Sequence, residues 1–149
     1  MKIAFEEWSA VTQLNFIEVT RNGNIKIAFV SGNHGDGYSF DGPGKILAHT
    51  LFPPYGLIHF DADERWAAMI NTELSKYDTI DLLPTAIHEI GHVLGLEHSW
   101  EKDSIMSPFY HYQTINDDGE YVKPKLTNCD ILRIQQLYGN FFLFQTKNT

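Results

Sequence analysis

The sequence contains a single cysteine, Cys129, among its 149 residues. No disulfide can therefore form within the chain, and cysteine usage does not indicate a compartment. No apolar run is long enough to cross a bilayer, since the apolar segment at 141–144 is far too short. Neither a signal peptide nor an Asn-x-Ser/Thr sequon is recognisable. These absences exclude a disulfide scaffold and predict no membrane span.

Basic residues are also scarce, with 11 Lys and Arg against 19 Asp and Glu, giving a formal net charge of -8. Phosphate binding needs a basic face, so nucleic acid is not expected as the main partner. The acidic excess has two readings. It can serve solubility, or several of the carboxylates can bind cations.

The hydrophobic pattern predicts a single α+β domain without repeats or linkers. Three-residue apolar steps predict a first helix, and alternating β-branched and aromatic residues predict strands. Pro84 is tolerated in the first turn of a later helix, and Gly139 would stop the last one, with Leu126, Ile131, Ile134 and Leu137 facing inward. The predicted helices cover 5–14, 85–95 and 125–139, and the predicted strands cover 25–30, 45–52 and 56–63.

The segment HEIGHVLGLEHS, at 88–99, carries the strongest chemical signal. His88 and His92 are four residues apart, so on a helix they project from one face and can share a zinc ion. Glu89 is rotated by about 100° from that face. It can therefore reach a zinc-bound water as a general base without occupying a coordination position.

Gly95 follows His92 by three residues, where a left-handed residue would end the helix and turn the chain back. The return would bring His98 to the same metal. Three neutral imidazoles leave a fourth position open, which is typical of a catalytic rather than a structural zinc site. An HExxH pattern alone often occurs by chance, but the added Gly95 and His98 make this signal specific.

A second group of possible ligands precedes this helix. Each of its histidines alone would be read as a surface or core residue. Together with the aspartate they could close a tetrahedral zinc with no open position. The group consists of His34, Asp36, His49 and His59.

Acidic residues lie between and after these ligands. Asp41, Asp61 and Glu64 offer hard carboxylate oxygens, and the backbone carbonyls of Gly42, Gly44 and Ile46 could join them as calcium ligands. A solvated Asp/Gly turn is the alternative reading of the same residues.

These motifs together resemble a known family. HExxHxxGxxH followed by a methionine is the metzincin pattern, and Ser99 after the third histidine resembles the matrixin branch, the matrix metalloproteinases. SIMSP, at 104–108, resembles the family's methionine turn, with Met106 beneath the zinc. PFY, from Pro108 to Tyr110, resembles one wall of the S1′ substrate pocket, with Phe109 at its centre. The resemblance extends from residue 4 to residue 139.

The resemblance implies a zinc endopeptidase that cleaves protein substrates of the extracellular-matrix type. It implies a metzincin fold, with a twisted mixed β-sheet and about three helices. It also implies a structural zinc at the second histidine group and a calcium at the acidic loop, so the expected cofactors are Zn2+ and Ca2+. An extended peptide would pair with the edge strand near 47–52 and place a hydrophobic P1′ side chain beside His88. A secreted, monomeric protein is expected from the resemblance alone.

The chain also departs from the family pattern. It starts inside the first helix, so the strand that precedes this helix in matrixins is expected to be missing. We therefore expect an N-terminally incomplete catalytic domain over 1–140 and a tail over 141–149. Cys129 and Arg133 replace a common aspartate and a common glycine of the last helix, whereas Asp130 remains.

Two other functions stay open at this point. One is a non-catalytic or truncated metal-binding domain of the same fold. The other is a metzincin of another branch, which Ser99 and the second histidine group disfavour.

Overall fold

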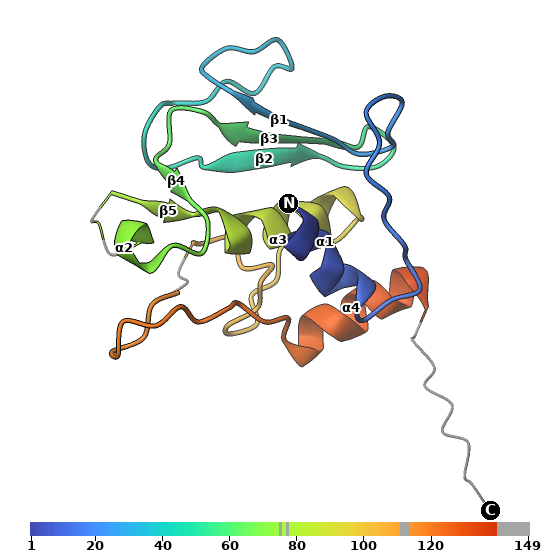
Figure 1. The fold of residues 1–149 in the computed structure, drawn as a ribbon. Helices are drawn as coiled ribbons and strands as arrows, with labels where there is room; N and C mark the ends of the chain where they lie inside the picture. The colour runs from blue at the N-terminus through green and yellow to red at the C-terminus, as the bar shows by residue number, and fades with distance from the viewer. Residues whose placement is uncertain (75, 77, 111–113, 140–149) are drawn as a thin grey trace, which may run out of the picture.

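The computed structural model describes residues 1–74, 76, 78–110 and 114–139 (Figure 1). The tail predicted over 141–149 lies outside these residues. The elements, in chain order, are α1 (Lys2–Ser9), β1 (Lys26–Val30), β2 (Ala48–Leu51), β3 (Leu57–Asp61), β4 (Trp66–Ala67), α2 (Asn71–Leu74), β5 (Ile80–Asp81), α3 (Leu82–Val93) and α4 (Asn128–Tyr138).

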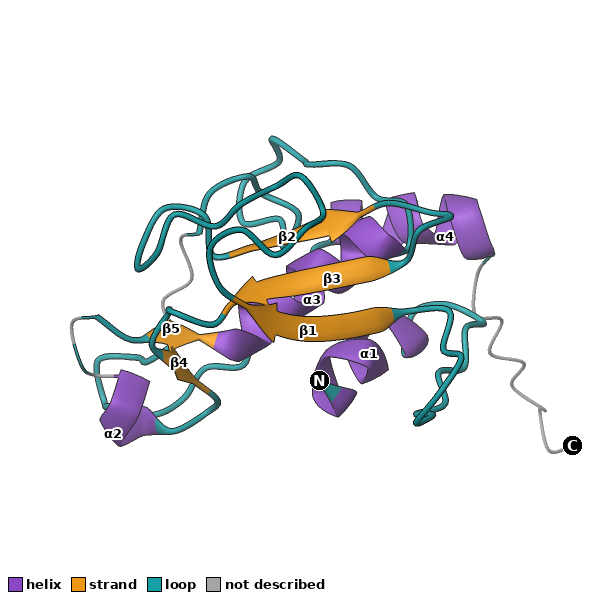
Figure 2. Cartoon of the chain, turned by 90° about the horizontal axis from the view of Figure 1, so that it is seen from above, coloured by secondary structure: helices purple, strands orange, loops and turns teal. Residues whose placement is uncertain are grey.

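The main sheet has the strand order β1-β3-β2 and is mixed, because β1 runs parallel to β3 and β2 runs antiparallel to it. Strand β2 is therefore an edge strand. Figure 2, seen from above, shows α1 and α3 on the same face of this sheet. The predicted α+β class with a mixed sheet is confirmed.

Three details of the sequence-based prediction need correction. The four-residue helix α2 and the short parallel β4-β5 pair were not predicted. Helix α1 ends at Ser9 rather than continuing to residue 14, and the Thr12 hydroxyl donates to the Trp8 carbonyl oxygen at 2.8 Å just beyond it. Leu137, predicted to face inward, is 54% exposed.

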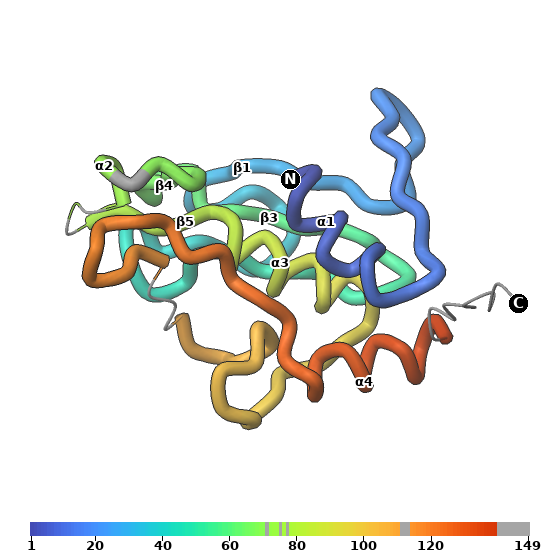
Figure 3. Tube along the Cα trace, turned by 60° about the horizontal axis from the view of Figure 1, so that its bottom comes forward, coloured from blue at the N-terminus to red at the C-terminus, as the bar shows by residue number. Residues whose placement is uncertain are grey.

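The core lies between the sheet and the helices. Trp8 of α1 and Ile134 of α4 are fully buried in the core cluster that also contains the apolar residues of α3, and the Trp8 indole donates to the Ile87 carbonyl oxygen at 2.9 Å. Figure 3 shows α1 alongside α3 and the segment 114–127 leading into α4. None of the described helices is long and apolar enough to cross a bilayer. Helix α3, which carries the HEIGH motif, is thus held from several sides.

Candidate metal centres

Local sequence signals set both ends of α3. The Asp81 side chain caps the N-terminus by accepting a hydrogen bond from the Leu83 N–H at 3.0 Å. Gly95 has φ +101, which a side chain would disfavour. The Gly95 N–H donates to the His92 carbonyl oxygen and the Leu96 N–H to that of Gly91, at 2.8 and 2.9 Å. This Schellman arrangement ends the helix and reverses the chain, as predicted.

The chain reversal brings three histidines together. His88, His92 and His98 each offer a ring nitrogen, and these nitrogens lie within 4.8 Å of one another. His88 Nδ1 lies 2.7 Å from the Ile105 carbonyl oxygen, and His92 Nδ1 lies 2.6 Å from that of Leu96. A carbonyl oxygen only accepts, so both Nδ1 atoms donate and both Nε2 lone pairs are left for a metal.

Burial sets the charge of this group. It lowers the pKa of His88 to about 4 and that of His92 to about 3, because charging an imidazole away from water is costly. Burial also lowers the pKa of His98, which is more exposed. The histidines are therefore neutral near pH 7, the form in which imidazole binds a metal.

Glu89 lies next to this group but is not part of it. Its side chain is buried, which raises the pKa of the carboxyl to about 7, opposed by a hydrogen bond from the Thr50 side chain. A carboxyl that ionises near neutral pH can both take up and release a proton, which suits a general base.

A buried turn lies beneath the three histidines. Met106 is fully buried, and its carbonyl oxygen accepts a hydrogen bond from the Ser99 N–H at 2.8 Å. A Cβ atom on Gly91 would lie 2.4 Å from the Met106 sulfur, so α3 and Met106 pack too closely to leave room for a side chain at position 91. The Asp130 carboxylate accepts hydrogen bonds from the Ser104 hydroxyl and the Ile105 N–H. Met106 thus packs directly against α3 and is tied to the segment that follows His98.

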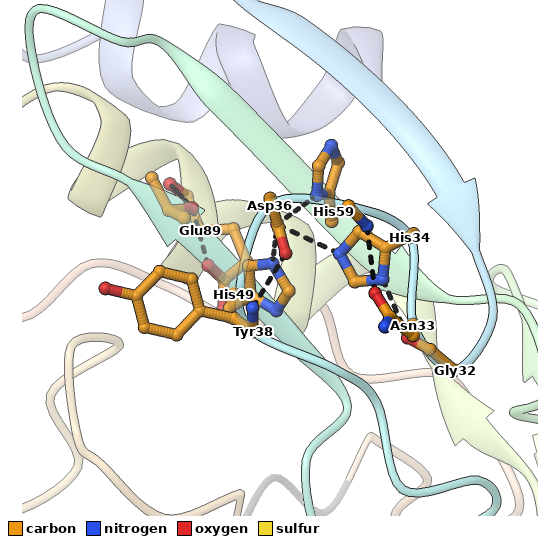
Figure 4. Close-up of polar contacts among 10 residues, drawn as sticks. Gly32, Asn33, His34, Asp36, Tyr38, His49, His59 and Glu89 are labelled. Atoms are coloured by element: carbon orange, nitrogen blue, oxygen red, sulfur yellow. Dashed lines mark hydrogen bonds and ion pairs between the residues drawn. The ribbon is translucent and has the colours of Figure 1, made fainter.

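The second predicted group also assembles (Figure 4). Asp36 Oδ2 lies 2.9 Å from His34 Nε2, 2.8 Å from His49 Nε2 and 2.9 Å from His59 Nδ1. The pairing of β2 with β3 sets His49 opposite His59. Burial opposes ionisation of Asp36, but hydrogen bonds from the Tyr38 N–H, His49 and His59 outweigh it and lower its pKa.

The proton positions in the group of His34, Asp36, His49 and His59 fit a bound metal better than they fit a network of hydrogen bonds. His34 Nδ1 lies 2.9 Å from the Gly32 carbonyl oxygen and must donate to it, so a neutral His34 presents a lone pair at Nε2. Within the part of the chain that the structure describes, that buried nitrogen makes no hydrogen bond, although it lies against a carboxylate oxygen. Two acceptors facing each other call for a cation, and three imidazoles with one carboxylate suit tetrahedral zinc.

The acidic loop is less tightly assembled. Asp61 is fully buried, and its Oδ2 has no hydrogen-bond partner among the described residues. Burial raises the pKa of Glu64, and the nearby charges of Asp61, Asp41 and Asp63 raise it further, against a hydrogen bond from the Gly44 N–H. A buried carboxylate oxygen without a partner, among like charges, fits a bound cation. Among the described residues, however, only the two histidine groups bring three or more such ligands within 4.8 Å.

A cleft of about 770 Å³ adjoins the three-histidine group. Residues of β2 line one side of it, and the predicted wall residues Pro108, Phe109 and Tyr110 line another. Phe109 is 65% exposed. The cleft also contacts His88 and Glu89, so a bound molecule would reach the carboxyl and the histidines together.

Two residues near the three histidines had not been assigned a role. The Thr50 hydroxyl contacts the Glu89 carboxylate. The Arg133 guanidinium donates to the carbonyl oxygens of Glu97 and His98 at 2.7 and 3.4 Å. Arg133 thus contacts the main chain of the third histidine. Cys129 Sγ lies 3.9 Å from the Ser99 hydroxyl oxygen.

Comparisons with known proteins agree with this geometry. The peptidase family described as Matrixin matches residues 1–139. Matrix metalloproteinase-C of Caenorhabditis elegans is 46% identical over 138 residues, which are 91% of this chain and 24% of that protein. Metalloendoproteinase 1 of Glycine max is 45% identical over 139 residues, 91% of this chain and 43% of that protein. Karilysin of Tannerella forsythia is 42% identical over 147 residues, 93% of this chain and 28% of that protein. The chain thus spans less than half the length of these relatives.

Proposed function

The chain belongs to the matrixin family of peptidases, and on that premise we propose that it is a zinc-dependent endopeptidase that hydrolyses peptide bonds of protein substrates. The observation that carries the proposal is the convergence of His88, His92 and His98 beside the buried carboxyl of Glu89. The named relatives are metalloproteinases, which agrees with the proposal.

His88, His92 and His98 would hold the catalytic zinc. The fit rests on the two Nδ1–H groups that donate to backbone carbonyls and on the lowered pKa values, which leave neutral nitrogen lone pairs for the ion. When bound, zinc supplies Lewis acidity to a carbonyl oxygen and acidifies water at neutral pH.

Glu89 would act as the general base. Its pKa near 7 lets the carboxylate take a proton from the attacking water and later pass it to the leaving amine. Burial limits the contact of the side chain with bulk water, which favours retention of the proton between the two steps.

The cleft and the edge strand would bind the substrate. Strand β2 is an edge of the sheet, so an extended peptide can add to it by main-chain hydrogen bonds. Pro108, Phe109 and Tyr110 would form the wall of a pocket for a hydrophobic P1′ side chain. We further propose that the enzyme is secreted and monomeric and that it cleaves proteins of the extracellular matrix.

Two further ions belong to the proposal. His34, Asp36, His49 and His59 would hold a structural zinc without an open position. Asp41, Asp61 and Glu64, with the backbone of Gly42, Gly44 and Ile46, would hold calcium, as the partnerless Oδ2 of Asp61 suggests.

The test is the substitution Glu89→Ala, measured with a quenched fluorescent peptide carrying leucine at P1′. We expect zinc content to be unchanged and cleavage to fall by roughly 100- to 10,000-fold, the usual contribution of a general base. Cleavage that survives the substitution would refute the role of Glu89. Full metal loading with no cleavage in the unsubstituted chain would favour the alternative, a non-catalytic metal-binding domain.

A further inference from the structure

The hydroxyl of Thr50 lies within hydrogen-bond distance of the reacting carboxyl of the proposed enzyme. Thr50 Oγ1 lies 2.6 Å from Glu89 Oε2 and 3.2 Å from the Glu89 main-chain oxygen. We propose that Thr50 is a positioning residue, which fixes one oxygen of Glu89 so that the other faces the cleft. This inference rests on the proposed function.

The strand geometry explains why Thr50 reaches Glu89. Residues alternate between the two faces of a strand. On β2, His49 therefore points to the second histidine group, while Thr50 points to α3. Figure 4 shows Glu89 beside the strand that carries His49. The contact joins residues 39 positions apart and is partly buried, so water competes with it only weakly.

The hydrogen bonds of Thr50 and Glu89 indicate which oxygen of the Glu89 carboxylate is held and which is available. A hydroxyl carries one proton, so Thr50 donates to one acceptor at a time. The shorter distance and the charge of the carboxylate favour Oε2 over the main-chain oxygen. Among the described residues no hydrogen bond to Glu89 Oε1 is found, and Glu89 lines the cleft. Oε1 is therefore the oxygen available to a reacting water.

Holding one oxygen matters because a free carboxylate rotates about its last side-chain torsion, which is broad. A general base must lie within hydrogen-bond distance of the proton that it abstracts. A misplacement of about 1 Å can reduce turnover roughly 100-fold. Thr50 would thus act on turnover through Glu89 and would leave substrate affinity and metal binding unchanged.

The experiment compares three substitutions in the whole chain, with zinc content and thermal unfolding measured for each. Thr50→Val keeps the shape and removes the hydroxyl, Thr50→Ser keeps the hydroxyl and removes a methyl group, and Thr50→Ala removes both. We expect kcat for the leucine-P1′ peptide to fall roughly 10- to 100-fold in the valine and alanine variants, with KM unchanged. The serine variant should stay close to the original chain.

A packing role predicts the opposite order, in which valine is tolerated while serine and alanine are impaired in parallel with their stability. That order, a valine variant with full kcat, or a loss traced to zinc content, would overturn the inference. If the valine variant does not fold, the comparison of serine with alanine decides in the same way. The Glu89→Ala variant separates the two levels: cleavage that persists there refutes the proposed function, whereas a cleavage-dead Glu89→Ala with a fully active Thr50→Val refutes only the role of Thr50.

Discussion

The two histidine groups use the same ligand chemistry, yet they differ in what occupies the fourth position. In the group of His34, His49 and His59, that position holds the carboxylate of Asp36. In the group of His88, His92 and His98, no fourth ligand lies close enough among the described residues, and the cleft lies there instead. The closed group of His34, Asp36, His49 and His59 can only bind an ion. The open group of His88, His92 and His98 can also expose a bound ion to a substrate.

The carboxyl of Asp36, in the closed group, and the carboxyl of Glu89, beside the open group, also differ in their pKa. Burial opposes ionisation of Asp36, but hydrogen bonds from the Tyr38 N–H, His49 and His59 outweigh it and lower its pKa. Burial raises the pKa of Glu89 to about 7, and a single hydroxyl opposes it. Asp36 is thus held as a permanent anion, as a ligand requires, and Glu89 can exchange a proton. The number of hydrogen bonds to each carboxyl separates a structural from a catalytic role.

The largest effect on activity is expected from removal of a ligand of the open group. His92→Ala should reduce peptide cleavage by at least about 1,000-fold, because without the Lewis acid Glu89 has no acidified water from which to take a proton. Elemental analysis should show zinc falling by one equivalent, with thermal unfolding little changed. A variant that keeps both zinc and activity would contradict the assigned ligand set.

The largest effect on stability is expected from the closed group. Asp36→Ala leaves three imidazoles without their shared anion and should destabilise the fold by about 3 kcal/mol or more, because metal binding contributes folding free energy. Urea unfolding at saturating zinc measures it. Asp63→Ala, which removes the carboxylate bound by Ser31, is a matched exposed control. Equal loss in both variants would mean that the closed group has no special structural role.

A ligand group can be predicted from the sequence when its residues lie close together in the chain. His88, His92, Gly95 and His98 follow helical spacing and one turn, so the open group could be predicted from the sequence. The closed group depends on the register that sets His49 opposite His59, and its function rested partly on the family resemblance. The ligands Asp41, Asp61 and Glu64 stay a prediction.

The sequence could not reveal contacts between distant segments. Thr50 and Glu89 are 39 residues apart, and Arg133 and Glu97 are 36 apart, so no local pattern connects them. The three-residue apolar period also misled us about the end of α1. Val11 and Leu14 pack against the core from a turn rather than from a helix. Their three-residue spacing therefore reflects tertiary packing and not a helical backbone.

A smaller effect is expected from the floor of the open group. A Cβ on Gly91 would lie 2.4 Å from the Met106 sulfur and 3.0 Å from the Trp8 ring, so Gly91→Ala overpacks a buried contact. We expect a destabilisation of about 1–3 kcal/mol, together with weaker zinc binding at the open group. Gly23→Ala, in a half-buried loop position with a milder contact at 3.1 Å, serves as the comparison. If the closed group loses zinc equally, the floor supports the whole fold rather than one site.

The smallest effect is expected at Arg133. Its guanidinium donates to the carbonyl oxygens of Glu97 and His98 and thus holds the main chain of the third histidine from outside. Its charge also helps to keep His92 neutral. Arg133→Ala should loosen His98 and weaken zinc binding at the open group about 10-fold, the lower end of the range for groups that orient metal ligands.

The comparison of the two groups supplies the control, because Arg133 touches neither His34 nor Asp36. Zinc titration with a competing chelator should show a weakened site and an unchanged one in the same molecule. Arg133→Lys keeps the charge but loses the planar fork, so it should recover only part of the affinity. Weakening of both sites would show that Arg133 acts through global stability. No change at either site would show that the turn ending at Gly95 positions His98 unaided.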